Sequence, residues 1–216
     1  HLFLSLSALL AALSIYAYQS EKVFTPLIII ALLIIYRKEI IKYPKKYLIS
    51  AFLVGLIVVI PMISYISTHR EALNRARGSL VFANQTSLLR NDTLRIQRDK
   101  DSNDLIGLGL DNRRIFYLKT GISGYLSHFD LNWLFVKGDL ARHHVPGMGL
   151  LYLWELPLIL IGIYFLIFNK DIDKNSKRII FAWFLIAPIP AAFTNDVPHA
   201  VRTINFLPIY QIFTAL

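Results

Sequence analysis

The feature that most constrains this chain is the grouping of its apolar residues into long runs. The runs occupy 2–18, 23–36, 47–66, 148–168 and 179–193, and a further one begins at 204. An α-helix needs roughly 20 apolar residues to cross the ~30 Å hydrocarbon core of a bilayer. These runs predict an all-α, polytopic membrane protein with about five to six transmembrane helices and an extracytoplasmic loop region that carries interfacial helices.

The composition agrees with a membrane protein and narrows its chemistry. Hydrophobic residues make up 55% of the chain and charged residues only 17%, against about a quarter charged in soluble domains. There is no cysteine, which excludes disulfides, thiolate metal ligands and a cysteine nucleophile. Loop Lys and Arg residues beside lipid headgroups account for the net charge of +9, so we expect no nucleic-acid partner.

The runs divide the chain into three regions. Residues 1–66 are predicted to form three transmembrane helices, and 148–216 three more, the last truncated. Between them, 67–147 is predicted to be an extracytoplasmic loop region. Within it we expect a loosely structured excursion over the polar 79–112, and an amphipathic interfacial helix over 112–127, where apolar residues recur at helical spacing. The chain starts without Met and ends inside an apolar run, so we expect a piece of a larger protein.

The distribution of basic residues predicts the orientation of the helices. The short connections 37–46 and 169–178 hold nine Lys and Arg residues, whereas 19–25 and 194–203 hold two. Because short basic loops stay on the cytoplasmic side of a membrane, the long 67–147 region is predicted to be extracytoplasmic. We therefore expect a multi-pass cell-membrane protein with an extracytoplasmic active face.

Three polar segments that are far apart in the sequence are predicted to share that outer face. They are 16–25, 137–155 and 195–202. A few convergent polar groups beside an apolar scaffold are typical of a ligand site. This predicted convergence is the main argument from the residues for an active site on the outer side of the membrane.

The segment 137–155 carries the densest group of charges. Lys137 and Arg142 are suited to neutralise a phosphate, while Asp139, His143 and His144 could donate or accept hydrogen bonds or hold a metal. Adjacent histidines do not make a metal motif, because neighbouring helical residues face different directions. The alternative is that these side chains simply meet lipid headgroups at the interface.

The segment 195–202 forms a second polar group. His199 and Arg202 are three residues apart and would share a face if the next helix starts near Pro198. The positive end of that helix would favour an anion beside Arg202. The alternative is a turn capped by Asp196, with Arg202 reaching to the interface.

Glu155 is expected about two turns inside the fourth apolar run. An acid within a membrane span is costly unless it is paired or faces a wet cavity, so it marks a functional site or an ion pair. It could pair with Arg142 or Arg202, or bind a divalent cation. Near the opposite end of the chain, Tyr16 and Tyr18 could form an aromatic anchoring belt or one wall of a lipid-linked ligand site.

The absence of several short catalytic motifs excludes the classes of enzyme that carry them. The chain has no GxxxxGK[ST], GxGxxG, GxSxG or HExxH sequence. Nucleotide-loop ATPases and the serine or zinc hydrolases that carry those motifs therefore have no support. We predict no dedicated metal site and no certain cofactor, and a divalent cation remains an open alternative.

Several motifs resemble those of GT-C superfamily glycosyltransferases of the protein mannosyltransferase type, family 39 and its bacterial relatives. Segment 6–36 resembles the family's helix that ends in a Tyr-x-Tyr-like pair, a basic residue and Phe-x-Pro, here Tyr16, Tyr18, Lys22, Phe24 and Pro26. Arg is more usual where Lys22 stands. Segment 125–164 resembles a later outer loop, through Phe129, Leu134, Phe135, Gly138, Asp139, Arg142, His143, Pro146, Gly149, Glu155 and Pro157. Segment 198–208 resembles the next outer turn, with Pro-His-x-x-Arg.

This resemblance implies transfer of a sugar from a polyprenyl-phosphate donor to an acceptor protein or glycolipid at the outer face of the lipid bilayer. Donor phosphate would be bound by Arg142, Lys137 and Arg202. Substrate would be positioned by His143, His199, Asp139, Glu155, Tyr16, Tyr18 and Lys22. The family's catalytic Asp lies in a first outer loop that we do not find, so we expect the general base outside this chain. The alternative is a transporter or flippase of lipid-linked saccharides.

Overall fold

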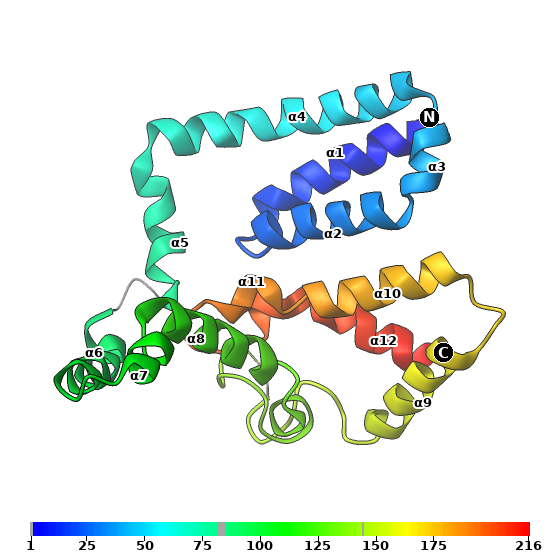
Figure 1. The fold of residues 1–216 in the computed structure, drawn as a ribbon. Helices are drawn as coiled ribbons and strands as arrows, with labels where there is room; N and C mark the ends of the chain where they lie inside the picture. The colour runs from blue at the N-terminus through cyan, green and yellow to red at the C-terminus, as the bar shows by residue number, and fades with distance from the viewer. Residues whose placement is uncertain (1, 82–84, 144) are drawn as a thin grey trace.

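The computed structural model describes residues 2–81, 85–143 and 145–216 (Figure 1). Its first elements are α1 (Leu2–Ala17), α2 (Glu21–Ile35), α3 (Arg37–Lys42), α4 (Lys45–Thr68), η1 (Arg70–Leu73), α5 (Asn74–Gly78), α6 (Gln85–Asp101) and α7 (Leu105–Leu110). They are followed by α8 (Arg113–Ser127), η3 (Trp133–Lys137), α9 (Glu155–Phe168), α10 (Lys174–Ile186), α11 (Ile189–Ala192), η4 (Val201–Phe206) and α12 (Leu207–Ala215). The described ranges contain no strand, only an isolated bridge between Leu80 and Thr194. The all-α prediction is confirmed.

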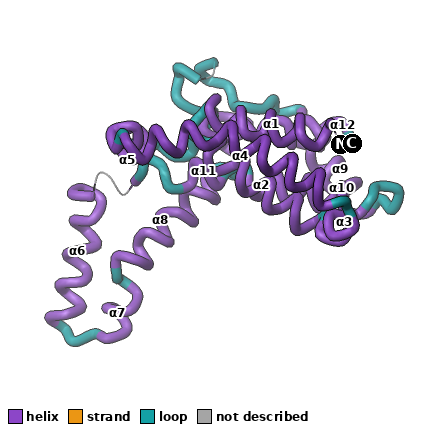
Figure 2. Tube along the Cα trace, turned by 90° about the horizontal axis from the view of Figure 1, so that it is seen from above, coloured by secondary structure: helices purple, strands orange, loops and turns teal. Residues whose placement is uncertain are grey.

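The long helices form two layers. In one, α1 packs against α4 and α2; in the other, α9 packs against α12 (Figure 1). Contacts between α2 and α10 join the layers. Figure 2 shows α6 and α7 extending away from them, while α8 leads back towards α11. Residues 67–147 are thus connected to both layers.

The helix lengths bear on the predicted number of membrane spans. Within the described residues, α4 alone is long and apolar enough to cross a bilayer, with 24 residues. The apolar helices α1 and α9 are shorter, at 16 and 14 residues. The fifth run is divided, because α10 ends at Ile186 and α11 starts only at Ile189, after Pro188. A five- or six-span arrangement stays a prediction.

The loosely structured excursion expected over 79–112 is wrong. The structure forms α6 and α7 there, and α7 has a regular N-terminal cap. The Asp104 carboxylate accepts hydrogen bonds from the N–H groups of Ile106 and Gly107, both at 3.0 Å. A helix that is polar over most of its surface leaves no apolar period to recognise, and this is why the sequence did not indicate α6.

The predicted amphipathic helix is present as α8, and it begins where the sequence places it. The Asn112 side chain accepts hydrogen bonds from the N–H groups of Arg114 and Ile115, which satisfies two donors of the first turn. The helix packs on α11 at Gly124, where a Cβ atom would overlap the carbonyl oxygen of Ala192. This close approach fixes the end of α8 beside the 194–200 turn.

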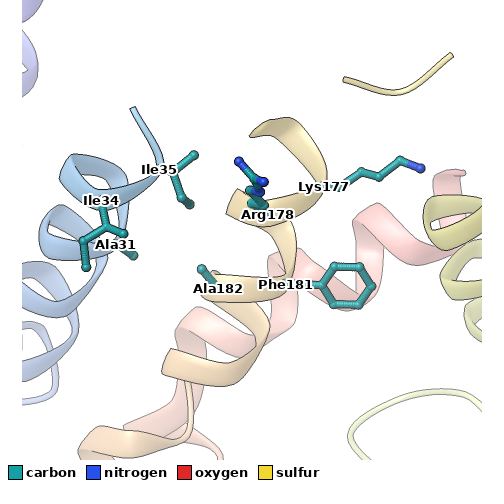
Figure 3. A pocket seen from close by; sticks show the side chains of 7 residues that line it. All are labelled: Ala31, Ile34, Ile35, Lys177, Arg178, Phe181 and Ala182. Atoms are coloured by element: carbon teal, nitrogen blue, oxygen red, sulfur yellow. The ribbon is translucent and has the colours of Figure 1, made fainter. Parts of the chain in front are cut away.

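A shallow, open groove of about 410 Å³ lies between α2 and α10 (Figure 3). It is lined by Ala31, Ile34, Ile35, Lys177, Arg178, Phe181 and Ala182. One of the cations at its wall has a structural role. The Lys177 ammonium donates hydrogen bonds to the carbonyls of Ile167 and Asn169 at the end of α9. Cations at a helix C-terminus stabilise the unpaired carbonyls there.

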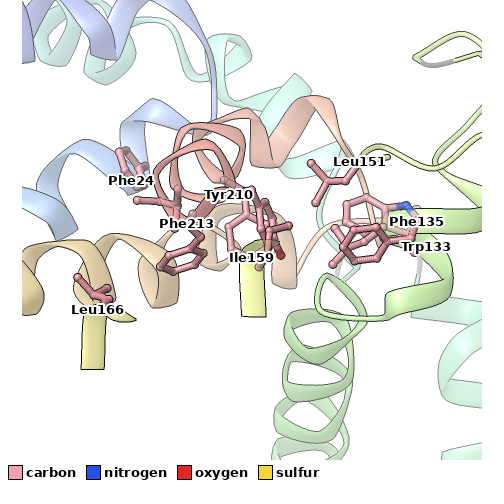
Figure 4. Close-up of a cluster of buried hydrophobic side chains, with 12 residues drawn as sticks. Phe24, Trp133, Phe135, Leu151, Ile159, Leu166, Tyr210 and Phe213 are labelled. Atoms are coloured by element: carbon pink, nitrogen blue, oxygen red, sulfur yellow. The ribbon is translucent and has the colours of Figure 1, made fainter. Parts of the chain in front are cut away.

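The hydrophobic core lies among α9, α10 and α12 (Figure 4). Phe213 and Ile209 of α12 are fully buried. Gly162 permits the close approach of α9, because a Cβ atom there would overlap the backbone of Phe213. The cluster continues through Phe135 and Leu151, which lie on either side of the loop before α9. The core therefore holds both ends of the loop that carries the predicted site residues.

Candidate functional site

The loop over 138–149 leaves η3 and folds back onto it. Gly138 adopts a positive φ of 68° directly after η3. At the other end, Gly149 packs on the backbone of Phe135, where any Cβ atom would overlap, and the Leu151 N–H donates to the Leu134 carbonyl at 2.9 Å. Both ends of the loop are fixed, so Asp139, near its start, has a defined position.

Asp139 joins this loop to the 194–200 turn. Its Oδ2 atom accepts hydrogen bonds from the Ala200 N–H at 2.8 Å and from His143 Nδ1 at 2.9 Å. The same oxygen lies 3.8 Å from His199 Nδ1. Burial by itself raises the pKa of the carboxyl, but the hydrogen bonds from Ala200, His143 and the Leu140 backbone outweigh it, and the pKa is lowered. Asp139 is therefore an ionised acceptor shared by two distant segments.

The two hydrogen bonds of His143 fit a ring that carries its proton on Nδ1. Its Nδ1–H donates to Asp139, so its Nε2 lone pair is left to accept the Nε–H of Arg142 at 3.1 Å. A protonated ring would have no lone pair for that second bond. His143 orients the Arg142 guanidinium through this hydrogen bond. Because the Arg142 side chain is exposed, it remains accessible to a ligand.

His128, which the sequence analysis missed, supports the site from beneath. It is fully buried at the end of α8, and its Nδ1–H donates to the Gly124 carbonyl at 2.7 Å. Its Nε2 accepts the backbone N–H of His199 at 3.2 Å. Burial lowers the pKa of His128 to about 4, in keeping with a neutral ring that donates at one nitrogen and accepts at the other. The only available signal was a histidine at the end of an amphipathic helix.

His199 is buried against His143, with ring centroids 4.8 Å apart. Its Nδ1 has no hydrogen-bond partner. Burial lowers the pKa of His199, the charge of Arg202 lowers it further, and Asp139 opposes both. The ring stands before η4, which begins at Val201. The helix start considered near Pro198 is therefore wrong, since Pro198 and His199 lie in the turn before η4.

Arg202 holds the turn together. Its NH1 group donates to the Thr194 hydroxyl at 2.7 Å and to the Asn195 carbonyl. The guanidinium is half-buried, and part of its donor capacity is used within the protein. Of the predicted phosphate-binding residues, Arg142 and Lys137 are exposed, whereas Arg202 is tied to the backbone of its own segment.

Glu155 is predicted to lie about two turns inside a helix, and this prediction is wrong. It is the first residue of α9, and its carboxylate accepts the Tyr152 N–H at 2.7 Å. The residues before it form a loop because Gly149 and Leu151 pack back onto η3. Glu155 thus caps its own helix, where a negative charge is favourable. His144, also considered as a ligand, lies outside the described residues.

The predicted residues of segment 16–25 make contacts elsewhere. The Tyr16 hydroxyl donates to the Val58 carbonyl of α4 at 2.6 Å, Lys22 donates to Gln19 at 2.9 Å, and Tyr18 is exposed. Among the described residues, no hydrogen bond links these three side chains to Asp139.

A different residue of segment 16–25 contacts η4. Glu21, at the start of α2, accepts a hydrogen bond from the Asn205 side chain of η4. The Asn205 carbonyl in turn accepts the indole N–H of Trp183 at 2.7 Å. Segment 16–25 therefore contacts η4 through Glu21 rather than through its predicted residues.

Asp139, His143 and His199 are also a possible metal-binding group. One potential ligand atom from each lies within 4.8 Å of the other two. Two imidazoles and a carboxylate suit divalent transition metals such as Zn²⁺. Their chemistry supports either a hydrogen-bonded charge cluster or a metal centre beside an exposed arginine.

No family model matches this chain, and neither the curated proteins nor the solved structures give a match. The resemblance to GT-C glycosyltransferases therefore rests on the short motifs quoted above.

Proposed function

We propose that this chain is the C-terminal part of a multi-pass membrane glycosyltransferase that uses a polyprenyl-phosphate sugar donor at the extracytoplasmic face. The observation that carries the proposal is the meeting of segments 137–155 and 195–202 at Asp139, beside the exposed Arg142. Such a meeting of polar groups from distant segments is typical of a ligand site, and the exposed arginine favours an anionic headgroup.

The apolar surface supports a location in the bilayer. Many large apolar side chains of α1, α4 and α9 are exposed, for example Phe52 and Ile57 of α4, whose relative exposures are 68% and 67%. Exposed apolar surface on this scale is favourable in contact with lipid and unfavourable in water. We propose that both layers of long helices are embedded in the membrane, with the loop over 138–149 at its outer surface.

The transfer reaction breaks the bond between the anomeric carbon and a phosphate oxygen of the donor. That oxygen keeps the electron pair, and the acceptor oxygen forms the new bond after a general base outside this chain removes its proton. Negative charge therefore grows on the leaving phosphate, and a cation oriented towards it accelerates the step. Arg142 is oriented by His143, and His143 is oriented by Asp139.

The other predicted residues take different parts. We propose that Lys137 adds a second exposed charge near the phosphate. Arg202 instead positions the 194–200 turn, through Thr194 and Asn195. His199 forms the wall beside His143. The acceptor protein or glycolipid would approach from the aqueous side.

The test is transfer of labelled sugar from a polyprenyl-phosphate donor by the full-length protein in membranes. Arg142→Ala should lower the rate roughly a hundredfold, with expression unchanged because the side chain is exposed. Arg98→Ala is the matched control, since Arg98 is an exposed arginine on α6 that extends away from the site. The proposal would be contradicted if Arg142→Ala and the double variant Arg142→Ala/Lys137→Ala both transferred sugar at the wild-type rate. Movement of intact donor across the bilayer without its consumption would indicate a flippase.

A further inference from the structure

We infer that Asp139, His143 and His199 form a binding site for a divalent transition metal, with Zn²⁺ the best match. The first observation is the Nδ1 atom of His199, which is buried and has no hydrogen-bond partner. A buried polar atom without a partner is destabilising, and native proteins rarely leave one. This atom faces the Asp139 carboxylate at 3.8 Å, next to a second imidazole.

The distances are close to those of a tetrahedral site. Zn²⁺ binds nitrogen and oxygen ligands at about 2.0–2.2 Å, so two tetrahedral ligands lie roughly 3.3–3.6 Å apart. The Asp139 Oδ2 atom lies 2.9 Å from His143 Nδ1 and 3.8 Å from His199 Nδ1. The two values bracket the required separation, and all three ligand atoms lie within 4.8 Å of one another, so an ion would draw the two imidazoles closer together around Asp139.

Binding can occur without a change in the number of protons on His143. The ring now carries its proton on Nδ1 and donates it to Asp139. When a metal takes that place, the proton moves to Nε2, which can then no longer accept from Arg142. The Arg142 side chain is exposed, and within the described residues its only side-chain hydrogen bond is the one to His143. Occupation of the site would therefore release the guanidinium that His143 otherwise holds.

Groups outside the three ligands hold them in place. Asp139 is oriented by the Ala200 N–H, and the backbone of His199 is fixed by the buried His128. Supporting hydrogen bonds of this kind tune and rigidify metal ligands. Three protein ligands leave one tetrahedral position open, as in catalytic zinc sites. The nearby charges of Arg142 and Arg202 weaken the binding of a cation and favour an anionic fourth ligand.

The experiment measures metal bound to the full-length protein in detergent and needs no transfer assay. EDTA-stripped protein is incubated with Zn²⁺, desalted and analysed by mass spectrometry for metal content, and its thermal unfolding is followed with and without Zn²⁺. We expect about one zinc per chain and a raised Tm, because a ligand that binds only the folded state stabilises it. Mg²⁺, which prefers oxygen ligands, should not raise the Tm.

Two variants and one control decide the outcome. His199→Ala and the half-buried His143→Gln should each lower zinc occupancy at least about tenfold, since even supporting groups change metal affinity by that much. His69→Ala should retain it, because His69 is exposed and stacks on Tyr65. Gel filtration confirms that each variant is folded. Wild-type protein without zinc, or equal zinc in wild type and in His143→Gln, would overturn the inference.

Discussion

Two regions of the molecule are stabilised in opposite ways. The α1/α4 pair is apolar, exposes most of its large side chains and has few polar links. The junction around Asp139 is small, polar and buried, and its links join residues 61 and 71 positions apart in the chain. In the first region many interchangeable apolar contacts act together, whereas in the second a few directed hydrogen bonds each have a specific partner.

This difference teaches where the molecule tolerates change. A packed pair of apolar helices loses little from one altered contact if neither an overlap nor a cavity is created. A hydrogen-bonded junction loses the full bond and leaves its partner unsatisfied. Four measurements, ordered by the size of the expected effect, can break or sharpen this contrast.

The largest effect is expected from Asp139→Ala. It removes the acceptor of the Ala200 N–H and of His143, and hydrogen bonds to a charged group contribute roughly 1.5–3 kcal/mol each. We expect a loss of about 4 kcal/mol in the free energy of unfolding, measured by denaturant titration in detergent with EDTA present. Asp101→Ala, which removes an exposed acceptor on α6, should change it little. Equal losses for the two variants would show that the junction is not a special region.

The next effect comes from the helix contact between α9 and α12. Gly162→Ala places a Cβ atom against the backbone of Phe213, which cannot move aside as a flexible side chain would. Overpacking of this kind costs about 1–3 kcal/mol, and a backbone clash belongs at the upper limit. The same unfolding measurement should show a loss of about 3 kcal/mol. An unchanged stability would mean that α9 and α12 do not pack closely at Gly162.

Acid should weaken the junction through His128. The folded pKa of about 4 lies below the usual value near 6.5, so the unfolded chain binds the proton first. The stabilisation is complete above about pH 6.5 and falls as the pH is lowered towards 4. Between pH 8 and pH 5 the loss is about 2 kcal/mol.

The matched control for this pH effect is His128→Gln. Its side chain does not titrate, so the part of the pH dependence due to His128 should disappear, even though the variant is less stable throughout. The titratable groups that act on His128 are His199 and Asp139, and both are unchanged in the variant. The same acid loss in wild type and variant would refute the assignment.

The smallest effect is expected in the apolar pair. A Cβ atom at Gly55 of α4 would meet Ala8 of α1 at ordinary contact distance, 3.8 Å from its carbonyl oxygen. Gly55→Ala should therefore be tolerated, and the higher helix propensity of alanine should raise the free energy of unfolding by up to about 1 kcal/mol. Gly55→Ala and Gly162→Ala thus make the same substitution once in each layer, so their effects on the free energy of unfolding can be compared directly. A large loss at Gly55 would mean that α1 and α4 are packed more tightly than their exposure indicates.

The sequence by itself determined the helical fold and the positions of its long apolar elements. Helix periodicity and capping are local properties, so α8 and its cap at Asn112 could be recognised from neighbouring residues. The sequence also indicated that Asp139, His143 and His199 belong to polar segments beside apolar runs, because such charged groups are easily recognised. It did not indicate the polar helix α6, which has no apolar period.

Only the tertiary structure decided which polar groups are partners. The Ala200 N–H meets Asp139, His199 meets His128, and Asn205 meets Glu21. No local pattern encodes these pairs, because they depend on how glycine contacts such as Gly124 against α11 place distant backbones side by side. Hydrogen bonds need atomic distances and directions, and these exist only once the helices have packed.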